Sequence, residues 1–119
     1  MAAIKARISV ENVSRGVIIT FTSEKILEER EISALELSIV PIIEQAGVPN
    51  IVLNFENVKF LSSAVLGLLI RISKKIYQRS GQLKLCCINS KIFEIFKITR
   101  LDRVFDIYDD VDSAVQSLA

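Results

Sequence analysis

Two adjacent serines, Ser62 and Ser63, stand where the chain passes from one apolar segment to another. Residues 58–61 end an extended apolar segment, and residues 64–70 are apolar enough to begin a buried helix. The first backbone N–H groups of a helix have no intrahelical acceptor, and the helix dipole favours negative charge there. A serine at this point can therefore cap the helix, or it can carry a phosphate group.

The other reactive side chains do not make a catalytic or metal-binding set. The chain has no histidine to act as a base, no Gly-x-Ser-x-Gly frame around Ser63 and no glycine-rich phosphate loop. Cys86 and Cys87 are the only cysteines, and we expect two small buried or half-buried residues with no disulfide or zinc role. We therefore expect a protein that is not an enzyme and that has no metal ion or cofactor.

Length and charge restrict the class of protein further. The 119 residues suit a single domain spanning residues 1–119, and 50% of them are hydrophobic, as in a globular protein. The formal net charge of +1, with interleaved acidic and basic residues, does not suggest a nucleic-acid partner. No run of residues is long and apolar enough for membrane insertion, and the first residues lack the layout of a signal peptide. These features predict a soluble, cytoplasmic protein.

The first part of the chain is predicted to form an antiparallel hairpin. Apolar and polar residues alternate over residues 4–10, which indicates a half-buried strand, and residues 17–21 form a more apolar second strand. Turn-forming residues over 12–16 would join the two. Residues 22–30 are polar and charged, so we expect a loop or a frayed helix start.

A helix is predicted next, from about Glu31 to Ala46. Its apolar residues recur at helical spacing, and Gly47 supplies a stop. Pro41 falls inside this pattern and removes one backbone donor. We therefore expect a kink or break near Val40.

The rest of the chain alternates between strands and helices. In order, the patterns predict a central strand buried on both faces over 51–55, a helix over 63–79, a strand over 82–88, a helix capped by Asn89 or Ser90, an edge strand over 104–108, and a terminal helix capped by Asp109 or Asp110. Strands separated by helices form parallel sheets. The fold class is therefore α/β, with a mixed, mostly parallel sheet of about five strands, about four helices and an antiparallel N-terminal hairpin.

Three motifs in this order resemble the STAS domain of bacterial anti-sigma factor antagonists. Residues 51–55 (IVLNF) and 58–63 (VKFLSS) are similar to an apolar strand ending in Asp, followed by Val-x-Phe-Ile/Met-Asp-Ser-Ser/Ala-Gly-Leu. Residues 98–109 (ITRLDRVFDIYD) are similar to the closing Thr-Gly-Leu-x-x-x-Phe-x-Ile-Tyr of that family. A terminal helix with Ala114 and Leu118 is the third feature. The resemblance covers nearly the whole chain.

The resemblance implies a regulatory binding protein that takes part in the control of transcription. Such a protein binds an anti-sigma factor, typically a serine protein kinase of the histidine-kinase-like ATPase fold, and is released when a serine at a helix N-terminus is phosphorylated. A serine phosphatase would reverse the step. Ser63 takes the place of the phosphorylated serine, with Ser62 as the second candidate. The partner-binding positions implied by the resemblance are Ser62, Ser63, Val65, Leu66, Asn54 and Glu28.

The sequence also departs from the family pattern. Ser62 stands where phosphorylated members usually have Asp, Asn54 stands where Asp is common, and Ala64-Val65 replace the usual Ser/Ala-Gly pair. These departures favour an alternative, a non-phosphorylated STAS scaffold or accessory subunit of a signalling or transport complex. At the residue level, we expect one of the two serines to act as a simple helix cap, and the extra apolar width of the helix at Leu66 and Ile70 to be core.

Overall fold

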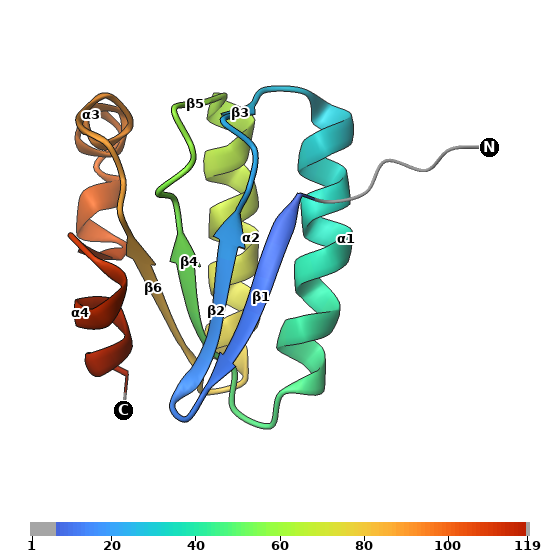
Figure 1. Ribbon diagram of the computed structural model, residues 1–119. Coiled ribbons are helices and arrows are strands. Elements are labelled where there is room, and N and C mark those ends of the chain that lie inside the picture. Colours follow the sequence, from blue (N-terminus) through green and yellow to red (C-terminus); the bar gives the residue numbers. More distant parts are fainter. Residues whose placement is uncertain (1–6, 119) are drawn as a thin grey trace.

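A five-stranded mixed sheet organises the molecule (Figure 1). The computed structural model describes residues 7–118. The strands, in their order across the sheet, are β1 (Ile8–Val13), β2 (Gly16–Phe21), β4 (Asn50–Asn54), β6 (Gln82–Cys86) and β7 (Asp106–Tyr108). Strands β1 and β2 are antiparallel, and every other neighbouring pair is parallel. The predicted mostly parallel sheet with an N-terminal hairpin is confirmed.

Helices cover the two faces of this sheet unequally. Helices α1 (Glu29–Gln45), α2 (Ser63–Gln78) and α3 (Ser90–Ile98) contribute buried side chains to one large core cluster. Helix α4 (Val111–Gln116) packs on the opposite face and forms a smaller cluster. A short 3-10 helix, η1 (Leu101–Arg103), links α3 to β7. Within residues 7–118, the structure contains no helix of the length and apolar character that crossing a membrane requires.

Strand β4 is buried on both faces, as predicted for the central strand. Ile51 and Leu53 belong to the core beneath α1, α2 and α3, whereas Val52 belongs to the core beneath α4. Alternate side chains of a strand point to opposite faces, so this single strand joins the two cores. Phe55 follows directly and packs against Phe21 of β2, with ring centroids 4.9 Å apart.

Helix α1 runs without interruption through Pro41, so the predicted break near Val40 is absent. The helix also begins at Glu29, two residues earlier than expected. Pro41 removes only the N–H group that would bond to the Leu37 carbonyl, and both residues lie on the exposed side of the helix, where water can hydrate that carbonyl. Ile39 and Ile43 are fully buried on the other side and hold the helix in place.

The first strand lies further along the chain than predicted. It runs from Ile8 to Val13, so the predicted turn shrinks to Ser14 and Arg15, and the predicted strand residues 4–6 lie outside the described residues. Half-burial is also not realised, since Val10 is 44% exposed. The reason is position, because β1 is an edge strand with only one neighbouring strand.

Glycine at position 81 permits a close approach between the two loops that precede β4 and β6. A Cβ atom there would collide with the Pro49 carbonyl group, which accepts a hydrogen bond from the neighbouring Gln82 N–H at 3.1 Å.

The Gly81→Ala variant should therefore lose about 1–3 kcal/mol of unfolding free energy, measured by urea denaturation. Gly47→Ala is the matched control, because a Cβ at that position meets no atom within 4 Å. Equal stability of the two variants would contradict this packing.

Candidate functional site

Ser62 and Ser63 lie at the carboxyl end of the parallel strands, where a second, very small sheet leads into α2. Strands β3 (Lys25–Ile26) and β5 (Phe60–Leu61) form a two-stranded parallel ladder. Strand β3 lies in a stretch predicted to be a loop or a frayed helix start, whereas β5 lies in the predicted extended segment. The Ser62 N–H continues this ladder by donating to the Ile26 carbonyl at 3.0 Å. Because Ile26 and Leu61 are both buried, the ladder fixes the residue at which α2 begins.

Ser62 occupies the N-cap position of α2, but its side chain does not cap the helix. Its backbone is extended, with φ −88° and ψ 163°, and its carbonyl accepts from the Val65 N–H at 3.0 Å. The Ser62 hydroxyl is buried and finds no hydrogen-bond partner in the part of the chain that the structure describes. The prediction that one of the two serines is the N-cap is therefore confirmed for its position, but the side-chain hydrogen bond of a capping serine is absent.

The other two predicted caps are confirmed and show what α2 lacks. The Asn89 Oδ1 atom accepts from the Ile92 N–H at 2.9 Å, and the Asp110 Oδ1 atom accepts from the Ser113 N–H at 2.7 Å. The bond to Ser113 lowers the pKa of the Asp110 carboxyl group. Helix α2 has neither such a side-chain acceptor nor an acidic residue in its first turn.

Ser63 is the first residue of α2 and is exposed. No residue between 7 and 118 accepts a hydrogen bond from the Ser63 or Ala64 N–H. The start of a 16-residue helix therefore keeps its free donors and its partial positive charge beside an accessible hydroxyl. A negatively charged group on Ser63 would be favourable there.

Exposed apolar and basic side chains line the short ladder that leads into Ser62 and Ser63. Leu27 follows β3 and is 50% exposed, and Phe60 of β5 is 47% exposed. The Lys25 Nζ atom lies 5.8 Å from the centroid of the Phe60 ring, and the Lys59 Nζ atom lies 3.3 Å from a Glu24 carboxylate oxygen. We call Lys25, Leu27, Lys59, Phe60 and Ser63 the ladder surface. Sequence reasoning missed Lys25 and Phe60, because two-residue strands leave no periodic pattern to detect.

A shallow cavity borders the ladder surface on the side of α3. Its volume is about 280 Å³, and its lining comprises Lys59, Phe60, Asn89, Ser90 and Lys91. The Asn89 Nδ2 group donates to the Val58 carbonyl at 3.2 Å, so the start of α3 is tied to the chain that leads into Ser62. The start of α3 therefore adjoins β5, the strand that leads into α2.

The predicted partner-binding residues fall into two groups. Ser63 and Glu28 are exposed, Glu28 at the N-cap position of α1. Val65, Leu66, Asn54 and the Ser62 hydroxyl are buried. Leu66 is core as expected, whereas Ile70 is 37% exposed, so the expectation that it is core is wrong. The Asn54 amide is held inside the protein, because Oδ1 accepts from the Glu56 N–H at 3.0 Å and Nδ2 donates to Thr20 Oγ1 at 3.3 Å.

Cys86 ends β6, and Cys87 follows it shortly before Asn89. Both are free thiols; Cys86 is buried and Cys87 is half-buried, as expected. Burial raises the pKa of the Cys86 thiol, and a hydrogen bond with Cys87 adds to the shift. Since the thiolate is the reactive form, the Cys86 thiol is poorly suited to act as a nucleophile at neutral pH.

The unpaired Ser62 hydroxyl predicts an unusual response to substitution. Replacing a serine that caps a helix usually costs about 1 kcal/mol, but Ser62→Ala should leave the free energy of unfolding unchanged or slightly higher, since it removes a buried hydroxyl without a partner. Asn89→Ala is the matched variant and should cost about 1–2 kcal/mol, because that cap is formed. Urea denaturation of both variants tests this, and a comparable loss in Ser62→Ala would show that its hydroxyl is bonded.

Comparisons with known proteins agree with this architecture. The sequence pattern of the STAS domain matches residues 7–114. The chain is 26% identical over 104 residues to the anti-sigma F factor antagonist of Paenibacillus polymyxa, and the alignment covers 87% of this chain and 88% of that protein.

Two solved structures share the fold. An anti-sigma-factor antagonist (STAS) domain protein from Planctomyces limnophilus superimposes with a TM-score of 0.85 at 23% identity, covering 98% of this chain and 100% of that chain. The phosphorylated form of the Bacillus cell fate determinant SpoIIAA superimposes with a TM-score of 0.73 at 20% identity, covering 94% of this chain and 99% of that chain. Because the STAS pattern matches almost the whole of this chain, the chain belongs to the STAS domain family.

Proposed function

We propose that this protein is a regulatory binding protein of the anti-sigma factor antagonist kind, controlled by phosphorylation of Ser63. In its unmodified state it binds a cytoplasmic anti-sigma factor that is also a serine protein kinase of the histidine-kinase-like ATPase fold. The observation that carries the proposal is the exposed Ser63 hydroxyl at the uncapped start of α2. The similarity to an anti-sigma F factor antagonist supports the class of partner, and the fold shared with a STAS protein solved in a phosphorylated form supports the kind of control.

Accessibility favours Ser63 over Ser62 as the phosphate acceptor. A kinase must bring the serine oxygen next to the terminal phosphate of ATP, so the oxygen has to be reachable from solvent. The Ser62 hydroxyl is buried, whereas Ser63 is exposed. Ser62 remains the second candidate, because it is adjacent and a small opening of the helix start would expose it.

Phosphorylation would act on the interface rather than on the fold. A phosphate adds nearly two negative charges and three acceptor oxygens. The free N–H groups and the dipole of α2 accommodate this charge, so the domain keeps its structure. A partner that packs against Leu27 and Phe60 would instead have to desolvate the phosphate, and the complex would dissociate. A serine phosphatase would restore binding.

Of the remaining proposed partner-binding residues, one can contact the partner directly, and the others stabilise the backbone around Ser63. Glu28 is exposed next to Leu27 and is available for direct contact with the partner. Val65 and Leu66 are core residues, so they act by holding the first turn of α2 in position. Asn54 is likewise buried and stabilises the turn that follows β4 through its two hydrogen bonds.

Incubation with the partner kinase and ATP, followed by intact mass spectrometry, tests the proposal. The wild type and Ser62→Ala should each gain one phosphate, and Ser63→Ala should gain none. In a binding assay with that kinase, Ser63→Asp should bind at least about tenfold more weakly than the wild type, because it places a carboxylate at the contact. Ser33→Asp, at an exposed serine within α1, is the matched control and should bind normally. Tight binding by Ser63→Asp would contradict the switch.

One observation favours a second candidate function, a non-phosphorylated STAS scaffold or accessory subunit of a signalling or transport complex. The first turn of α2 carries no acidic residue, and Ser62 stands where phosphorylated members have a carboxylate. The same mass measurement separates the two candidates. A chain that binds its partner but never gains a phosphate fits the scaffold, whereas one full equivalent of phosphate on the peptide containing Ser62 and Ser63 excludes it.

A further inference from the structure

The near-neutral net charge of this chain hides a strong separation of charge. Between positions 71 and 103 there are nine basic and two acidic residues, a net charge of +7, so the rest of the chain carries −6. The basic residues are Arg71, Lys74, Lys75, Arg79, Lys84, Lys91, Lys97, Arg100 and Arg103. All of them except the half-buried Lys84 are exposed, on α2, α3 and η1 and their ends. Two of them are paired with acidic residues outside this span, Arg71 with Glu36 and Lys84 with Asp106. The remaining exposed cations attract anionic surfaces.

Aliphatic side chains protrude from the same part of the molecule. Ile98, the last residue of α3, is 79% exposed, and Val104, directly after η1, is 59% exposed. Lys97, Arg100 and Arg103 alternate with them along the chain, and Asp102 is the one acidic residue between positions 97 and 104. We call Lys97, Ile98, Arg100, Arg103 and Val104 the α3–η1 corner.

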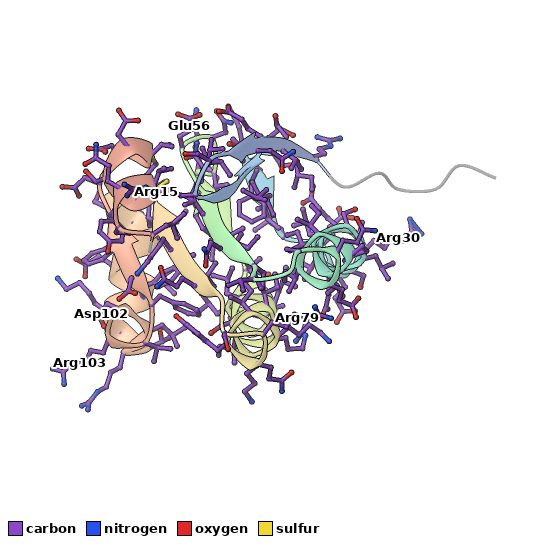
Figure 2. The ribbon with its side chains drawn as sticks, turned by 90° about the horizontal axis from the view of Figure 1, so that it is seen from below. Arg15, Arg30, Glu56, Arg79, Asp102 and Arg103 are labelled. Carbon is purple, nitrogen blue, oxygen red and sulfur yellow. The ribbon has the colours of Figure 1, made fainter. Side chains whose placement is uncertain are left out.

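The cations of the α3–η1 corner are largely unused within the protein. Lys97 has one weak pairing, with 3.4 Å between its Nζ atom and a Glu94 carboxylate oxygen, and both side chains are exposed. Neither Arg100 nor Arg103 has an acidic partner among residues 7–118. Figure 2 shows Arg103 pointing away from the body of the molecule, and Arg30 of α1 projecting from the opposite side.

We propose that the α3–η1 corner docks onto an anionic phospholipid surface. Aliphatic tips flanked by Lys and Arg are the pattern of interfacial membrane binding, in which the tips enter the headgroup layer and the cations meet lipid phosphates. Protruding tips need no pre-formed pocket in a fluid layer, whereas a folded acidic protein would need a matching hollow for each. Docking of this kind uses surface residues and requires no spanning helix. It uses none of the residues of the ladder surface, so it does not depend on the proposed phosphorylation of Ser63.

Vesicle flotation with the full chain tests the proposal. Large vesicles of phosphatidylcholine and phosphatidylglycerol at about a 3:1 ratio should bind the protein at low salt, and vesicles of phosphatidylcholine alone should not. Raising the salt concentration should release it, because a shorter Debye length screens the attraction. Failure to bind the anionic vesicles at low salt would overturn the proposal and leave an acidic protein as the occupant of the corner.

Two matched pairs of variants separate local docking from general charge. Arg103→Glu should weaken binding about 25-fold, roughly fivefold for each unit of charge, whereas Arg30→Glu, with the same change in net charge, should have little effect. Ile98→Gln should weaken binding to the vesicles. Leu37→Gln should not, because Leu37 is similarly exposed (76%) but lies on α1, a helix that carries four glutamates and should not approach an anionic surface. Thermal unfolding of each variant verifies that it is folded. Equal effects within either pair would overturn the proposal.

Discussion

Burial of β4 on both faces is the constraint on which the rest of the structure depends. Ile51 and Leu53 need cover from one layer of helices and Val52 needs cover from α4, so the chain must place helices on both sides of one sheet. At the end of this strand, the buried Asn54 side-chain oxygen accepts from the Glu56 N–H, and the Phe55 N–H donates to the Cys86 carbonyl at 3.0 Å. The candidate site lies in the segment that follows.

Backbone contacts, rather than charged side chains, position that site. The β3–β5 ladder is far too small to be stable alone, yet Ile26 and Leu61 anchor it in the main core and Ser62 extends it by one hydrogen bond. Such an arrangement needs no carboxylate near the serine pair. It can therefore keep the start of α2 in place even though Ser62 and Asn54 occupy positions where an acidic residue is usual in the family.

The layers of the fold were predictable because they follow from long-range patterns of burial. The apolar run at β4 and the helical spacing in α1 and α2 each report which side faces the core, and the sequence therefore predicts the order of strands and helices. The predictions failed where a local rule competed with tertiary contacts. Pro41 does not break α1, because Ile39 and Ile43, which flank it in the sequence, are fully buried and hold the helix in place. Ser62 occupies the N-cap position of α2, but its side chain does not cap the helix, because its hydroxyl is buried with no partner in the described part of the chain. Two-residue strands and the exposure of Phe60 depend on contacts that only the folded chain brings together.

The missing side-chain cap at Ser62 also has a consequence for local dynamics. The ends of helices open more easily than their middles, and a capping hydrogen bond raises the free energy of that opening. Residues 63 and 64 lack this protection, so they should unwind at lower cost than the start of α3, where the Asn89 cap must first be broken. The uncapped turn would give a modifying enzyme access to Ser63 while the anchored ladder and the core beneath it stay folded.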